Sequence, residues 1–71
     1  HVNLNFTLKS SEQVQVEVID MMGKVVLKHN GGQMNAGSQQ IRLNTRELAS
    51  GNYIVRMVEG SQVRAAKITL K

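Results

Sequence analysis

The sequence predicts an all-β domain, an antiparallel β-sandwich of six or seven short strands. Three observations support this fold class. Apolar and polar residues alternate along most of the 71-residue chain, which is the period of a strand with one buried face. Turn signals separate the alternating segments roughly every ten residues, as they do in sandwiches. No helical period extends over more than about two turns.

The first two predicted strands lie near the N-terminus. Apolar side chains occupy alternate positions of two segments, namely Val2, Leu4, Phe6 and Leu8, then Val14, Val16 and Val18. Gly23 follows in residues 21–24, where a tight turn needs a residue that accepts positive φ. Each segment is therefore expected to bury one face, and the glycine to turn the chain into a third strand.

The third strand is predicted over residues 24–29. Its faces are expected to carry Val25 and Leu27 on one side and Lys24, Val26 and Lys28 on the other. Residues 30–38 contain three of the six glycines and have the composition of a turn-rich segment. We expect them to form a mobile surface loop.

The C-terminal half is predicted to contain three more strands. Their inward-facing residues are Ile41 and Leu43, then Tyr53, Val55 and Met57, then Ala66, Ile68 and Leu70. Residues 45–50 lack alternation and are too short for a stable helix, so we expect one helical or 3₁₀ turn there. Gly60 is expected to begin a two-residue turn of type II′. Val63 is out of phase with its strand, which indicates a bulge or an exposed first residue.

Composition argues against several classes of protein. The chain has no cysteine, so it has neither a disulfide nor a thiolate. Nine Lys and Arg residues against five Asp and Glu residues give a net charge of +4, but the positive residues are spaced singly. Because one Phe and one Tyr also offer little surface for base stacking, we expect no nucleic-acid partner. The apolar runs are far shorter than the roughly 20 residues of a membrane helix, so we expect no direct membrane insertion.

Residues with catalytic or metal-binding chemistry are few and scattered. His1 and His29 are the only histidines, and neither has an evident partner for general-base chemistry. The acidic residues are expected on turns and outward strand positions, without metal-ligand spacing: Glu12, Glu17, Asp20, Glu47 and Glu59. We therefore predict a domain that is not an enzyme, with no catalytic residue, no metal and no cofactor.

Three motifs follow one another along the chain. Residues 16–26 join two strands through an Asp-x-x-Gly turn, and residues 48–57 run from Leu-Ala-Ser-Gly-Asn-Tyr into an alternating strand. Residues 65–71 form an apolar strand that contains Lys67 and ends on Lys71. In this order, residues 14–71 resemble the type A C-terminal sorting domain of proteins exported by the bacterial type IX secretion system.

The resemblance implies an immunoglobulin-like β-sandwich that acts as a secretion signal. Such a domain directs an exported cargo protein from the periplasm to the outer-membrane translocon, and a surface sortase then usually removes it. The cargo remains on the outer-membrane surface or is secreted. The motif positions carried over to this chain are Lys67, Lys71, Asp20 and Gly23 for partner recognition, and Gly51 and Tyr53 for structure.

Most of these motif residues also have a purely structural explanation. The two glycines satisfy backbone geometry, Tyr53 follows the pattern of a tyrosine corner, and Asp20 is expected to cap its own turn. Lys67 and Lys71 differ, because both should project to solvent, where folding places little demand on their identity. The alternative function is a non-catalytic accessory or adhesive β-sandwich domain of a larger extracellular protein.

Proline is absent from the chain, whereas members of the family usually begin with a proline-containing segment. We therefore expect residues 1–71 to be a single sorting domain that lacks this opening segment. A missing strand leaves backbone donors and acceptors unpaired along a sheet edge. For this reason we expect a homodimer through exposed edge strands.

Overall fold

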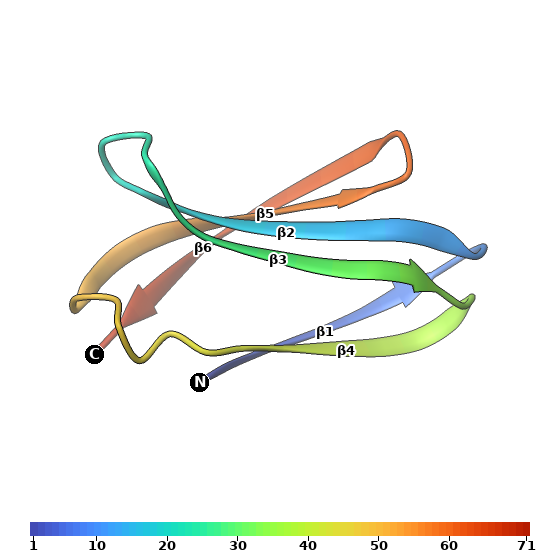
Figure 1. The fold of residues 1–71 in the computed structure, drawn as a ribbon, viewed down its shortest axis with the longest axis horizontal. Helices are drawn as coiled ribbons and strands as arrows, with labels where there is room; N and C mark the ends of the chain where they lie inside the picture. Colours follow the sequence, from blue (N-terminus) through green and yellow to red (C-terminus); the bar gives the residue numbers. More distant parts are fainter.

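The computed structural model describes residues 1–71, which form six antiparallel strands and no helix (Figure 1). The strands are β1 (Val2–Leu8), β2 (Glu12–Asp20), β3 (Val25–Met34), β4 (Gly37–Leu43), β5 (Gly51–Glu59) and β6 (Gln62–Leu70). β1 pairs with β4 in a two-stranded sheet, and the others form a four-stranded sheet in the order β3-β2-β5-β6. The predicted all-β sandwich is confirmed, with six strands divided between two sheets.

The core lies between the two sheets and depends most on β2 and β5, the two inner strands of the larger sheet. Val14, Val16 and Val18 of β2 are at most 1% exposed, as their alternation predicts. The rest of the buried apolar cluster comes from β1, β4 and β5, namely Leu8, Ile41, Leu43, Tyr53, Val55 and Met57. Complete burial of one valine contributes about 1.5–3 kcal/mol, so this small cluster supplies much of the driving force for folding.

β3 departs from the predicted assignment of faces. Val18 pairs with Leu27 and Ile19 with Val25, so Val26 is an extra residue in β3 and the register shifts there. Because of this bulge, Val26 and Leu27 both pack against the core, whereas Val25 is exposed. The prediction that placed Val25 with Leu27 on one face and Val26 on the other was wrong, because it assumed an uninterrupted register.

Residues 30–38 are not a loop, and this prediction was also wrong. β3 continues to Met34 and β4 begins at Gly37, so the chain crosses from one sheet to the other within two residues. A second register shift falls at Gly31, where a Cβ atom would lie 3.3 Å from the Val14 carbonyl oxygen and 3.4 Å from Ile41 Cδ1. A glycine is suited to this position because the strand passes close to the core there.

Most of the turns agree with those predicted from the sequence. Gly60 has a φ of +57° and no non-glycine residue has positive φ, which fits the predicted type II′ turn between the paired residues Glu59 and Gln62. β6 keeps one register with β5 throughout, so Val63 is an exposed first residue and not a bulge. Residues 45–50 contain a single turn, closed by the Leu48 amide donating to the Thr45 carbonyl at 3.0 Å, and no helix.

Tyr53 closes the connection between β4 and β5. Its ring is buried in the core, and its hydroxyl donates to the Ala49 carbonyl oxygen at 2.7 Å. This is the arrangement of a tyrosine corner, in which one side chain joins the core to a segment that has no ladder hydrogen bonds of its own. The predicted structural role of Tyr53 therefore has a direct physical basis.

Truncating Tyr53 tests this role. Tyr53→Ala should destabilise the domain by about 3–5 kcal/mol, the usual effect of deleting a buried aromatic ring. Tyr53→Phe removes only the hydroxyl and should lower the unfolding free energy by about 1 kcal/mol. Urea unfolding followed by circular dichroism measures both, and equal stability of Tyr53→Ala and the wild type would contradict the corner.

Candidate functional site

Lys67 and Lys71 lie at the outer edge of the larger sheet. Lys67 is exposed on β6, between Ala66 and Ile68, which face the other sheet, and Lys71 follows the end of the strand. Neither lysine takes part in an ion pair or a side-chain hydrogen bond within the chain. The expected solvent exposure of both is confirmed, and their charges remain free to meet a partner.

The Asp20–Gly23 turn joins β2 to β3 and is satisfied internally. Asp20 Oδ1 accepts hydrogen bonds from the Met22 and Lys24 amides, both at 2.9 Å. The Gly23 amide donates to the Asp20 carbonyl at 3.1 Å, and Gly23 has a φ of +87°. Asp20 thus caps its own turn, as expected, and the turn presents Met22, which is 93% exposed, at its tip.

The fold brings the separate sequence motifs to one end of the four-stranded sheet. Asp20 pairs with Tyr53, which in turn pairs with Ile68. Gly51 pairs with Leu70, so the corner glycine lies beside the last residue of β6. Since neighbouring strands are about 4.8 Å apart, Asp20 and Ile68 are separated by about 10 Å across the sheet.

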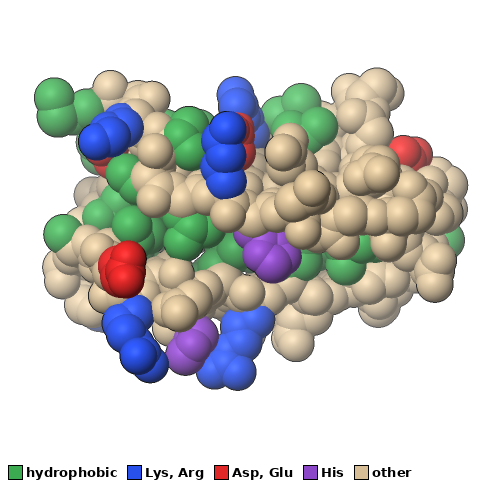
Figure 2. Space-filling model, in the orientation of Figure 1, with side chains coloured by type: hydrophobic (Ala, Val, Ile, Leu, Met, Phe, Trp, Pro, Cys, Tyr) green, Lys and Arg blue, Asp and Glu red, His purple; other side chains and the backbone are tan.

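Two cations from distant parts of the sequence line one hollow at this end, although the acidic Glu47 follows one of them in the chain. A hollow of about 460 Å³ is lined by Lys71, Arg46 and His1, together with residues of β1, β6 and the turn after β4. Arg46 lies in that turn and is exposed, 25 positions before Lys71 in the sequence. No local pattern could have placed the two together, because their proximity results from the way the strands pair. Figure 2 shows Lys and Arg side chains at several places on one face of the molecule, with acidic side chains beside some of them.

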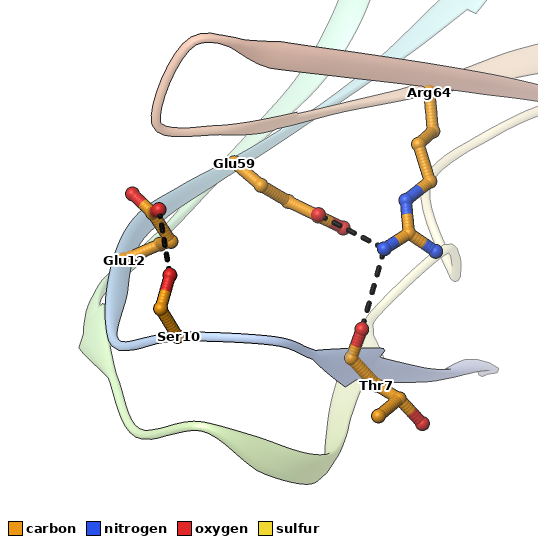
Figure 3. Close-up of polar contacts among 5 residues, drawn as sticks. All are labelled: Thr7, Ser10, Glu12, Glu59 and Arg64. Carbon is orange, nitrogen blue, oxygen red and sulfur yellow. Dashed lines mark hydrogen bonds and ion pairs between the residues drawn. The ribbon is translucent and has the colours of Figure 1, made fainter.

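Glu59 and Arg64 form a polar contact at the opposite end of the sandwich (Figure 3). Glu59 is only 5% exposed, so the prediction that placed this acid outward was wrong. It continues the inward alternation of Tyr53, Val55 and Met57 on β5. The Arg64 Nη2 atom donates to Glu59 Oε2 at 3.0 Å and to the Thr7 carbonyl oxygen at 3.3 Å.

This contact links the two sheets on a side where no strands pair. Thr7 belongs to β1 and Arg64 to β6, and one guanidinium nitrogen bridges them while neutralising a buried carboxylate. Glu59 Oε1 is buried without a hydrogen-bond partner, so Arg64 carries most of the compensation for this charge. The role of the pair is structural.

The residues with catalytic or metal-binding chemistry remain scattered in the folded domain. His29 lies half-buried on β3, and no group of three or more His, Cys, Asp or Glu side chains is placed to hold a metal ion. The structure also contains no helix of the length and hydropathy needed to cross a bilayer. The features that remain are an exposed strand end, a capped turn and a positively charged hollow, which are suited to recognition.

A family model described as the secretion system C-terminal sorting domain matches residues 1–71. The chain belongs to this family. The match confirms the resemblance to type IX sorting domains and extends it from residues 14–71 to the whole chain. The domain is a secretion signal with no catalytic activity of its own, and the alternative of an accessory or adhesive sandwich is set aside. No curated protein and no solved structure matches the chain.

The Glu59–Arg64 contact should contribute to the unfolding free energy of the domain. Arg64→Met should lower the unfolding free energy by about 1–3 kcal/mol, because it leaves the buried Glu59 without its main partner, while exposure of Arg64 moderates the effect. Lys67→Met is the matched control on the same strand and should change stability by no more than about 0.5 kcal/mol. The measurement is urea unfolding at neutral pH, and equal midpoints for the two variants would contradict the assigned role.

Proposed function

We propose that the folded domain is recognised by the outer-membrane translocon of the type IX system through the positive end of its larger sheet. The residues that would carry recognition are Lys67 and Lys71, with Arg46 beside Lys71. A surface sortase then removes the domain, and the cargo stays on the outer-membrane surface or is released. Membership in the family implies that the domain interacts with secretion machinery and that its protein is exported.

The observation that carries this proposal is the free charge of the two lysines. Lys67 is exposed on β6, whose other face contributes to the core, and Lys71 is exposed immediately after this strand. Neither lysine forms an ion pair. Complementary charge increases the rate and specificity of protein association more than it increases affinity. Exposed lysines at a defined sheet end are therefore suited to guiding a folded domain to an acidic receptor.

The neighbouring Asp20–Gly23 turn is a second candidate surface. Because the Asp20 carboxylate is engaged by Met22 and Lys24, a partner would meet the shape of this turn and its exposed Met21 and Met22 side chains. In this proposal Asp20 and Gly23 contribute indirectly, by holding the turn in a fixed conformation. The lysines and the turn are close enough to belong to one contact area, since both lie at the same end of the sheet.

The double variant Lys67→Ala/Lys71→Ala tests the lysines. We expect its melting temperature to stay within about 4 °C of the wild type, because removing exposed, unpaired charges affects stability little. Surface display of a cargo fused to the variant should fall at least tenfold in a type IX-competent cell, with the cargo retained in the periplasm. Fractionation followed by immunoblotting measures the distribution.

A matched control separates position from net charge. Lys9→Ala/Lys28→Ala removes the same charge from exposed lysines outside the positive end, and it should be displayed like the wild type. Normal display of the Lys67/Lys71 variant would eliminate the lysines as recognition residues and direct attention to the Asp20–Gly23 turn. Restoring a proline-containing segment before residue 1 in parallel fusions tests the expectation that the family's opening segment is needed for export.

Self-association is a further proposal for the isolated domain. β1 is a free sheet edge whose sequence, Val-Asn-Leu-Asn-Phe-Thr-Leu, contains no charged residue to oppose pairing with a second copy. We expect a weak, concentration-dependent homodimer in sedimentation-velocity experiments. A single monomeric species at millimolar protein concentration would contradict it.

A further inference from the structure

One side of the sandwich is open. β3 and β4 are joined by a two-residue connection and close the other side, whereas β1 and β6 each end their sheet without a neighbouring strand (Figure 1). Between β1 and β6 runs a groove of about 410 Å³, in which seven of the ten lining residues are hydrophobic. Arg64 lies at one end of the groove, held by its contacts with Glu59 and Thr7.

The lining residues show that the groove follows the edges of both strands. Successive residues of a strand point to opposite faces, so a groove over one face would be lined by every second residue. Here four consecutive residues of β1, 3–6, and three consecutive residues of β6, 64–66, line it. The backbone edges of β1 and β6 therefore form its walls, and each edge carries unpaired donors and acceptors.

The groove is also incompletely filled. Ala66 pairs with the buried Val55 and faces the interior, yet it is exposed. Leu4 and Phe6 on the opposite wall are only partly buried. An extended segment of about five residues spans roughly 17 Å and would match the lined stretch of β6, Arg64 to Ile68. Its apolar side chains would lie beside Ala66 and Phe6 and cover the core.

Charge indicates what kind of segment fits. β6 carries Arg64 and Lys67 and no acidic residue, and β1 carries no charge at all. Arg64 uses only its Nη2 atom in the contacts with Glu59 and Thr7, which leaves Nε and Nη1 without an acceptor in the chain. Arg64 pairs with the inward-facing Met57 and lies on the groove side of β6, whereas Lys67 lies on the outer face. A strand with alternating apolar and acidic residues would place apolar side chains in the groove and carboxylates near Lys67, and an acidic residue at the end of such a strand would reach Arg64.

A second copy of the chain cannot supply such an alternately apolar and acidic strand. All five acidic residues lie on the inner strands β2 and β5 or in the turn before β5: Glu12, Glu17, Asp20, Glu47 and Glu59. The edge strands β1, β3, β4 and β6 contain none, so a copy could offer only a neutral or a positive edge. Pairing of β1 with β1 is compatible with the weak dimer proposed above but leaves Arg64 and Lys67 without a negative partner.

We propose that the groove between β1 and β6 is a strand-addition site, which accepts an extended, acidic and alternately apolar segment of a secretion-machinery protein along the free edge of β6. This inference rests on the proposed function for the identity of the partner. Main-chain hydrogen bonds to the edge give such a complex its affinity, and the side-chain positions in the groove give it specificity. Adding the strand completes the open side of the sandwich.

The first test uses the 71-residue chain and synthetic peptides. An acetylated eight-residue peptide in which glutamate alternates with valine is titrated into ¹⁵N-labelled protein. We expect saturable amide shifts confined to residues 3–6 and 64–68, and at least tenfold weaker binding of the matched peptide with lysine in place of glutamate. Shifts elsewhere, equal binding of the two peptides, or no shift at millimolar peptide overturns the proposal. So does the appearance of the same shifts on concentrating the protein alone, which identifies a second copy as the occupant.

The second test fills the groove. Ala66→Phe should weaken binding of the glutamate peptide at least tenfold, and Ala66→Leu provides a smaller change if the phenylalanine variant does not fold. Ala36→Phe, at the exposed connection between β3 and β4, is the matched control and should bind like the wild type. Unchanged affinity in a folded Ala66 variant overturns the proposal.

Display of fused cargo distinguishes this inference from the proposed function. If the wild-type fusion reaches the surface and the folded Ala66 variant is displayed equally well, the translocon does not use the groove, and the inference fails while the proposed function stands. Reduced display of the Ala66 variant with normal display of Ala36→Phe supports the inference. Failure of the wild-type fusion to reach the surface counts against the proposed function, and the peptide titration then decides separately whether the groove binds an acidic strand.

Discussion

The pairing of β2 with β5 is the constraint on which the rest of this domain depends. The inner face of β2 supplies Val14, Val16 and Val18, the most completely buried of its residues, and β5 supplies the aromatic ring of Tyr53 beside them. A chain of this length buries only about 60% of the surface that it exposes when unfolded, and it has no disulfide to limit the entropy of the unfolded state. The outer strands β3 and β6 gain their order from this central pair, and the short turns next to it keep the loss of conformational entropy small.

The same arrangement separates the residues that stabilise the fold from the exposed residues to which the proposed function assigns recognition. The Asp20 turn and the Tyr53 corner hold one end of the larger sheet through hydrogen bonds within the chain. Lys67 and Lys71 stand at that end without partners, and pairing of the strands brings Arg46 beside Lys71. A sorting signal of this kind must be stably folded and must also present an accessible surface to its receptor. In the proposed function, a sheet end with free cations would meet both demands, because these cations lie outside the core.

The two sides of the sandwich differ for a topological reason. The two-residue connection between β3 and β4 joins the sheets on one side, whereas β1 and β6 have no covalent or ladder connection on the other. Arg64 partly substitutes for that connection by reaching from β6 to the Thr7 carbonyl on β1. A single half-exposed side chain cannot exclude water from a whole groove, and the apolar lining beside Ala66 therefore stays accessible. The open side combines unpaired backbone with apolar surface, which is the combination that strand addition uses.

Alternation in the sequence by itself determined the fold class, all six strands and the inward faces of β1, β2, β4 and β5, and glycine positions determined the turns at Gly23 and Gly60. An uninterrupted alternation of apolar and polar residues indicates a strand with one buried face, so these assignments needed no tertiary information. The family motifs also identified the recognition candidates. Tertiary structure decided the rest. The bulge at Val26 turned Val25 outward and Val26 toward the core, since a register shift leaves no mark in the hydrophobic pattern. Gly31 lies in a strand, at a position suited to glycine because it passes close to the Val14 carbonyl oxygen. The glycine-rich composition of this segment does not reveal that contact. Glu59 is buried because Arg64, across a hairpin, compensates its charge, and the groove exists only because β1 and β6 end separate sheets.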